Sequence, residues 1–348
     1  MARTVTNAGR TLQPLPGSRP DLLRRLMCHP RIPNIPDEQL FETDIDNVTA
    51  TQIDDNSVVL LTQDHFNDML DNDLERYEEP DAFSGPQVMT GDLRRVWKAT
   101  CVYEQLSENH PRIVRFQYRD PFFGVPILDM PSTTVDRLTA KYRSSMYFNA
   151  DGQTRITPKY RPLIYQWALH LVSALSFVHS KNILFGDLQI ELCWLSSSLS
   201  LSLLSFLDAV YIDSQTMRKY INGTGRDEPF HPCNIPRRHS QVATVHTDLF
   251  LWGCLVYQLM TESWPGHEQD RQDAEMRHMV VEHQWPILER EYLGDIVRKC
   301  WECGYVDVEE LKRDLDDFLT SKGWEVDGDE LCGFQATELF EENSISVR

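Results

Sequence analysis

The sequence predicts an α+β protein in which a small, mainly β part with one helix precedes a larger, mainly α part. Short apolar runs of strand type, interrupted by a single helical pattern, occupy the region before residue 130. Long apolar patterns with the period of an α-helix dominate after residue 160. A chain of 348 residues with 41% hydrophobic and 25% charged residues can bury a sizeable core, as soluble globular proteins do.

The first part combines strand patterns with one helix. Ser57–Leu61 is an aliphatic run bounded by polar residues, which predicts a strand. Leu93–Leu106 carries apolar residues at spacings of three and four, which predicts a helix. Further strands are expected within His110–Phe116 and Gly124–Leu128.

The second part is predicted to form around two core helices. Residues 162–179 place an apolar stripe on one face at a period of 3.6. Leu249–Met260 is apolar on nearly every side, which predicts a helix that is buried all round. Two short strands around a turn are expected within Leu195–Val210, and amphipathic helices over Tyr292–Lys299 and Val308–Leu319.

These patterns divide the chain into four segments. Residues 1–44 are rich in proline, arginine and asparagine, which predicts a partly disordered arm or a docking segment. Residues 45–130 form the small lobe and residues 131–322 the large lobe. Residues 323–348 form an acidic tail that we expect to be loosely held.

The charge of the chain restricts its partners. A net charge of −19 argues against nucleic acid and against anionic membranes, because both are bound by clustered lysine and arginine. Between Asp37 and Asp81, fifteen acidic residues accompany one basic residue, Arg76, and we interpret this run as a solvated face. The expected partner is therefore a protein, with a basic surface that complements the acidic small lobe.

The composition also indicates a cellular compartment. No apolar segment of signal-peptide type is evident near the start, and the longest apolar run is shorter than the roughly 20 residues that span a bilayer. Among the eight cysteines, Cys300 and Cys303 have metal-like spacing, but no second pair completes a metal site. We expect a reducing, intracellular location, either cytoplasmic or nuclear.

Four motifs follow one another with a characteristic spacing. They are Tyr103–Leu106 with His110–Val114, His179–Leu188 with its Gly-Asp-Leu sequence, Thr247–Leu255 with Tyr257–Thr261, and the pair Cys300–Trp301. Together they resemble the protein kinase superfamily, in particular a divergent kinase-like group common in fungi. The resemblance covers about residues 55–320 and implies a two-lobed fold with ATP and magnesium chemistry between the lobes.

The resemblance assigns roles to residues of the large lobe. Asp187 corresponds to the catalytic-loop aspartate, although Phe185 and Gly186 replace the His-Arg pair that usually precedes it. Leu192 stands where the family has a magnesium-binding asparagine, and an aliphatic side chain cannot ligate magnesium.

Two further aspartates correspond to family positions. The metal-binding aspartate corresponds either to the position of Phe206 or to Asp208, and the sequence leaves both alignments open. Asp248 is expected to be structural and to hold the backbone of the catalytic loop. Ile235–Arg237 falls where the family has Ala-Pro-Glu, so the charge at its last position is reversed.

The nucleotide-binding features of the small lobe are missing. The first lysine of the chain is Lys98, and no glycine lies between Gly17 and Gly85. The predicted strand Ser57–Leu61 therefore has no phosphate-binding lysine. No glycine-rich turn precedes it to place backbone amides over phosphates. Arg76 or Arg94 would be poor replacements, because a planar guanidinium differs from an ammonium group. Lys98 could reach toward phosphates from the helix, beside Ala99 at the position of the helix glutamate.

We therefore expect a pseudokinase, a kinase-like protein without catalysis and without a cofactor, that acts as a regulatory, protein-binding scaffold. One alternative is an atypical Ser/Thr protein kinase that uses ATP and magnesium through Asp187, Asp208 and Lys98. A second alternative is a small-molecule phosphotransferase of related fold. Losing one preorganised charge typically costs about 10²–10³ in rate, so the missing groups favour the pseudokinase.

Overall fold

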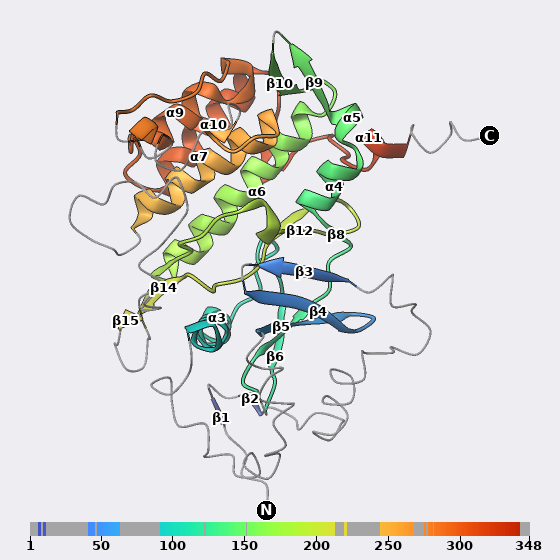
Figure 1. The fold of residues 1–348 in the computed structure, drawn as a ribbon, viewed down its shortest axis with the longest axis vertical. Coiled ribbons are helices and arrows are strands. Elements are labelled where there is room, and N and C mark those ends of the chain that lie inside the picture. The colour runs from blue at the N-terminus through green and yellow to red at the C-terminus, as the bar shows by residue number, and fades with distance from the viewer. Residues whose placement is uncertain are drawn as a thin grey trace, which may run out of the picture.

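The computed structural model describes residues 6–7, 10–11, 41–45, 47–62, 91–121, 123–150, 152–212, 219–220, 244–267, 275, 278–280 and 282–341. It confirms the α+β class: a sheet built from the first part of the sequence is followed by a mainly helical part (Figure 1). Thr6–Asn7 (β1) and Arg10–Thr11 (β2) form a short antiparallel ladder of their own. Residues 1–5, 8–9 and 12–40 of the proline-rich arm, the acidic stretch 63–90 and Ile235–Arg237 lie outside the described residues.

The main sheet has five antiparallel strands in the order β3-β4-β5-β7-β6. Their bounds are Glu42–Ile45 (β3), Val48–Asp54 (β4), Ser57–Thr62 (β5), Phe116–Arg119 (β6) and Pro126–Asp129 (β7). The central strand β5 is buried at all of its positions, because it has neighbours on both edges and helix α3 (Gly91–Leu106) packs against it. Figure 1 shows α3 beside the sheet.

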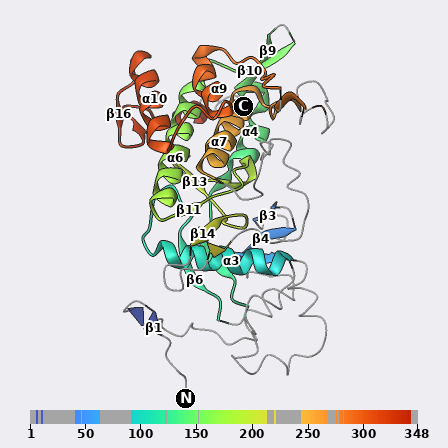
Figure 2. The ribbon, with the colours of Figure 1, turned by 90° about the vertical axis from the view of Figure 1, so that its left-hand side faces the viewer.

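The helical part surrounds two long helices, α6 (Arg161–Ser180) and α7 (Val245–Thr261). Both were predicted, and α7 is buried nearly all round, as its continuous apolar sequence requires. One hairpin, Tyr147–Ala150 (β9) with Gln153–Ile156 (β10), lies in this part. Further helices here are α4 (Val135–Lys141), α5 (Arg143–Met146), η5 (Arg290–Tyr292), α9 (Gly294–Trp301) and α10 (Val308–Ser321). Figure 2 shows α3 crossing below these helices. Among the described residues, no helix is long and apolar enough to cross a membrane.

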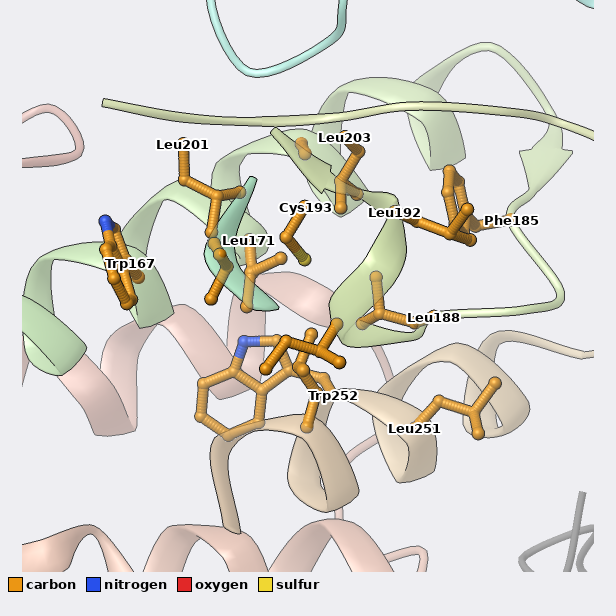
Figure 3. Packing of buried hydrophobic residues seen from close by; sticks show 14 of the residues in the cluster. Trp167, Leu171, Phe185, Leu188, Leu192, Cys193, Leu201, Leu203, Leu251 and Trp252 are labelled. Carbon is orange, nitrogen blue, oxygen red and sulfur yellow. The ribbon is translucent and has the colours of Figure 1, made fainter. Parts of the chain in front are cut away.

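Small strands lie between the main sheet and the helices. One set pairs in the order β13-β12-β8, from Thr133–Thr134 (β8), Cys193–Leu195 (β12) and Leu201–Leu203 (β13). The two strands around a turn that were predicted within Leu195–Val210 are present, but the hairpin begins two residues earlier and ends at Leu203. The other set is Ile183–Leu184 (β11), Val210–Ile212 (β14) and Lys219–Tyr220 (β15), and the short helix η3 (Ile190–Leu192) connects the two regions. Figure 3 shows Cys193 of β12 and Leu201 and Leu203 of β13 among the apolar side chains packed near Trp167 of α6 and Trp252 of α7.

Two expectations were wrong in detail. The segment expected to enter a strand at His110 forms a turn first, because the His110 ring accepts a hydrogen bond from the Arg112 amide, and β6 begins only at Phe116. The sheet also begins three residues before the expected boundary at residue 45, with β3 at Glu42.

The acidic tail is folded where it is described, rather than loosely held. It contains β16 (Val326–Asp327), β17 (Glu330–Leu331) and α11 (Glu338–Glu341). Leu331 and Phe340 are buried, with 3% and 9% of their surface exposed. Because these apolar residues are buried, the segment is held in spite of its negative charge.

Candidate site between the sheet and the helices

Asp248 holds the loop that carries the Gly-Asp-Leu motif. It lies in the first turn of α7, which begins with a capping box formed by Thr244 and Thr247. Its carboxylate is fully buried and accepts hydrogen bonds from the amides of Phe185, at 2.8 Å, and Gly186, at 2.7 Å. The Nε2 atom of His179 lies 2.8 Å from the same carboxylate. The structural role expected for Asp248 agrees with these contacts.

The anchored loop packs closely on the segment that contains Asp208. Gly186 has a positive φ of 84°, and a Cβ atom there would lie 2.5 Å from the backbone oxygen of Asp208. Asp187 follows, and its Oδ1 atom accepts a hydrogen bond from the Gln189 side chain at 2.7 Å. Leu192 is buried in η3 with 2% exposure, so it contributes to the core and offers no oxygen ligand.

The two residues left as alternatives for the metal-binding position have different surroundings. Phe206 is fully buried and makes edge contacts with the rings of Phe185, at 5.5 Å, and Tyr103, at 4.9 Å. Ser205, which has a positive φ of 75°, donates its amide hydrogen to the Tyr103 hydroxyl. This backbone conformation turns Phe206 into the core, whereas Asp208 extends to helix α3.

Asp208 pairs with a cation that the sequence interpretation did not identify. The Nη2 atom of Arg95 lies 2.6 Å from Oδ2 of Asp208, and the two side chains are only 6% and 18% exposed. Arg95 also contacts Asp92, at 3.2 Å, from the preceding turn of α3. The signal was present in the sequence, because Arg95 is spaced by three, four and seven residues from Lys98, Ala99 and Val102 on the buried face of α3.

Lys98 lies on the same face of α3 and is 5% exposed. Burial lowers its pKa to about 7; the charge of Asp208 opposes this shift, and that of Arg95 adds to it. The charges of Lys98 and Asp208, which the sequence interpretation named together only in the atypical-kinase alternative, interact in the structure. The strand β5 itself presents only aliphatic side chains from Val58 to Leu61.

Aromatic side chains join the first edge of the sheet to the helical part. Phe41, just before β3, makes an edge contact with Trp194 of β12, with ring centroids 5.4 Å apart, and both residues are buried. The guanidinium of Arg137 lies 4.8 Å from the Phe41 ring and also donates to the backbone oxygen of Glu42. The sequence interpretation missed this contact, because Phe41 was placed in the arm.

The connection between β3 and β4 is short. Ile45 pairs directly with Val48, so a turn of only two residues joins the strands. Asn47 in this turn donates a hydrogen bond to Asp92 of α3 at 3.2 Å. A turn of this length, without glycine, gives little backbone with which to cover a phosphate.

Comparisons with known proteins give no further assignment. No protein-family model matches the chain, and no curated protein sequence matches it.

Proposed function

We propose that this chain is a kinase-like pseudokinase that acts as a regulatory, protein-binding scaffold. Three features of the described structure support a two-lobed kinase-like fold: a five-stranded antiparallel sheet with one packed helix, a mainly helical second part, and a Gly-Asp-Leu loop held by the aspartate of a buried helix. Fold does not imply catalysis, so the function must be argued from the site.

The observation that carries this proposal is the ion pair between Arg95 and Asp208. In the expected kinase arrangement, an aspartate here would bind magnesium. Instead, a guanidinium of the same chain lies 2.6 Å from the carboxylate in a largely buried position. Magnesium keeps its water ligands and needs several oxygen ligands, so it would have to displace Arg95 with little help from the neighbouring Leu192.

The surroundings of the sheet support the same conclusion. Phe41 rests on Trp194 where the edge of the sheet meets the helical part, and the two-residue turn replaces a glycine-rich loop. The strand β5 is aliphatic throughout, so it supplies no charge for a phosphate. These features favour a protein that needs neither ATP nor magnesium.

A second candidate function is favoured by the position of Lys98. Its amine lies close enough to Asp208 for the two charges to interact, and helix α3 turns both Lys98 and Arg95 inward. An atypical ATP-dependent Ser/Thr protein kinase would use this lysine for phosphates, Asp208 for magnesium and Asp187 for the substrate hydroxyl. It would first have to separate Asp208 from Arg95.

The proposed partner is a protein with a basic surface, because the chain has a net charge of −19. The same charge argues against nucleic acid and anionic membranes. An intracellular location, cytoplasmic or nuclear, agrees with the free cysteines among the described residues.

A phosphate-transfer assay separates the two functions. We expect wild-type protein, given ATP with Mg²⁺ or Mn²⁺ and a mixture of protein substrates, to transfer no more phosphate than Asp187→Ala. Transfer that Asp187→Ala abolishes would overturn the scaffold proposal and support the atypical kinase. Lys98→Met serves as a second test, since the kinase alternative assigns the phosphate contact to that amine.

A further inference from the structure

The described C-terminal residues 324–341, here called the terminal segment, contact α6 and the turn before β6 through specific polar groups. Arg112 in that turn donates to both carboxylate oxygens of Asp329 at 2.8 Å, and it also contacts Glu330. Arg112 is 4% exposed, so these carboxylates provide its charge compensation in place of water.

Gln166 of α6 binds the backbone of the same hairpin. Its side-chain oxygen accepts the amide hydrogen of Leu331 at 2.6 Å, and its side-chain nitrogen donates to the carbonyl of Asp329 at 2.7 Å. These two bonds hold the backbone on either side of Glu330 against α6. The recognition therefore combines main-chain hydrogen bonds with charge pairing, as in sites that bind peptides.

Apolar contacts complete the attachment. Leu331 is buried directly after the two acidic residues. Phe340 in α11 contacts the rings of Tyr142, at 4.5 Å, and Tyr160, at 5.4 Å. The segment thus presents two consecutive acidic residues, an aliphatic residue and a more distant aromatic residue to one surface.

The terminal segment is connected to the helical part at one end. Gly323, directly after the C-cap of α10, has a positive φ of 85°, and a Cβ atom there would meet nothing within 4 Å. The Gly323 amide donates to the Thr320 carbonyl and the Trp324 amide to the Leu319 carbonyl, both at 3.0 Å, so this glycine forms the C-terminal cap of α10. Release of the segment from the surface would therefore begin after Trp324 and leave the cap in place.

A metal site does not explain this cluster. His170, Asp329 and Glu330 could place ligand atoms within 4.8 Å of one another. However, the guanidinium of Arg112 already binds both carboxylates. Both ring nitrogens of His170 already have neighbours: Nδ1 accepts a hydrogen bond from the Leu201 amide at 3.1 Å, and Nε2 lies 2.7 Å from the side-chain nitrogen of Gln166. The guanidinium of Arg112 therefore takes the place that a metal would need beside the two carboxylates.

We propose that the surface formed by Arg112, Gln166, Tyr142 and Tyr160 is a docking site for an acidic peptide, which would come from a different protein than the basic partner proposed above. The terminal segment occupies this site as an intramolecular competitor. The partner peptide would contain two consecutive acidic residues followed by an aliphatic residue. Charge complementarity supports this choice, because the surface offers a desolvated arginine although the chain as a whole is acidic.

The polar contacts at this site suit a segment that a partner peptide can replace better than one that stays bound permanently. A buried ion pair adds little net stability compared with apolar packing, but it discriminates strongly between partners. A segment that stays covalently attached beside its site has an effective concentration of about millimolar, so a free peptide competes poorly until the segment is weakened or released.

The test uses the full chain and a fluorescein-labelled peptide of residues 324–341, with binding followed by fluorescence anisotropy. The variant Asp329→Asn, Glu330→Gln, Leu331→Ala weakens the chain's own segment. We expect it to bind the labelled peptide at least about tenfold more tightly than wild type does. Adding Arg112→Gln to this variant should remove that gain, and a peptide carrying the same three changes should not bind.

Three results would overturn the proposal. The first is a folded triple variant, judged by circular dichroism and its unfolding midpoint, that binds the peptide no more tightly than wild type. The second is a wild-type dimer in light scattering that the triple variant converts to a monomer, because the occupant would then be a second copy of this chain.

Hydrogen exchange of wild-type protein decides the matter if the triple variant does not fold. The proposal expects the Leu331 amide to exchange at least about 100 times faster than the central amides of α6, because local release precedes global unfolding. Equal rates in the two places are the third contradicting result, since the terminal segment would then open only with the whole protein.

Discussion

At the scale of single residues, one buried carboxylate holds the loop that carries the Gly-Asp-Leu sequence. Asp248 accepts hydrogen bonds from two consecutive loop amides and lies beside His179, which joins α7 to the loop and to the end of α6. Buried amides that lose their acceptor retain the full cost of leaving water.

Substitution of Asp248 by alanine should destabilise the protein by about 3 kcal/mol, because two buried amides would lose their partner. Urea unfolding of the two proteins measures the difference. Asp187→Ala is the matched control, since Asp187 is half-buried and bonds to the side chain of Gln189. If Asp248→Ala, like the control, lowered the free energy of unfolding by less than about 1 kcal/mol, Asp248 would not hold the loop.

A second residue-scale prediction concerns Gly186. A methyl group there would lie 2.5 Å from the carbonyl oxygen of Asp208, so the loop and that segment would have to separate. Gly186→Ala should therefore cost more than Gly152→Ala, which has a similar positive φ of 80° but nothing within 4 Å. We expect about 1 kcal/mol for the control and at least about 3 kcal/mol for Gly186→Ala. Equal unfolding midpoints would contradict the close packing.

At the scale of elements, α3 determines the electrostatics of the candidate site. Its buried face carries Arg95 and Lys98 as well as apolar residues, and the charges meet Asp208 from the segment after β13. The pKa of Lys98 is lowered to about 7, first by burial and then by Arg95. The folded protein therefore releases a proton that the unfolded chain retains up to its ordinary pKa.

This difference predicts the effect of pH on stability. Between the folded pKa and the unfolded pKa the unfolded state binds more protons, so Lys98 makes stability rise as the pH increases. Relative to Lys98→Met, wild type should gain about 2 kcal/mol between about pH 7.5 and about pH 9.5. Unfolding curves across this range measure the gain. Lys181→Met, at a more exposed lysine, is the control, and its stability should change with pH as that of wild type does. If the stability of Lys98→Met also changes with pH as that of wild type does, the pKa of Lys98 is not lowered in the folded protein.

Periodicity predicted the helices well, because their apolar stripes depend only on local sequence. The expected helix at 162–179 is α6 at Arg161–Ser180, and the expected helix at Leu93–Leu106 is α3 at Gly91–Leu106. The strand expected at His110 was displaced, since a side-chain hydrogen bond of His110 stabilises a turn that apolar patterns do not reveal. The pairing of Arg95 with Asp208 joins residues far apart in sequence and could not be predicted from spacing alone.

At the scale of the whole molecule, segments from both ends of the chain attach to the helical part. Phe41 precedes the first strand of the sheet and contacts Trp194, while the terminal segment bonds to Arg112 and Gln166. The sequence predicted a partly disordered arm over residues 1–44 and a loosely held tail, because proline-rich and acidic composition resembles that of unpacked chain. In the described part of these two segments, a few side chains are buried in spite of that composition: Phe41 in the arm, and Leu331 and Phe340 in the tail.

The contact of Phe41 with Trp194 gives a prediction at this scale. Phe41→Ala should destabilise the protein by about 2–4 kcal/mol, because it removes a buried ring and its edge contact. Thermal unfolding measures the change, and Phe148→Ala, at a 39% exposed phenylalanine, is the control. If Phe41→Ala costs no more than the control, the sheet edge is not joined to the helical part by this contact.

We propose that this chain does not bind ATP with magnesium, because Arg95 pairs with Asp208 and strand β5 supplies no charge for a phosphate. The most direct test is the melting temperature of wild-type protein with and without 1 mM ATP and Mg²⁺ or Mn²⁺. We expect no shift, because a ligand that does not bind the folded state cannot stabilise it. A concentration-dependent rise in melting temperature at sub-millimolar nucleotide would show that the folded protein binds ATP and that this proposal is wrong.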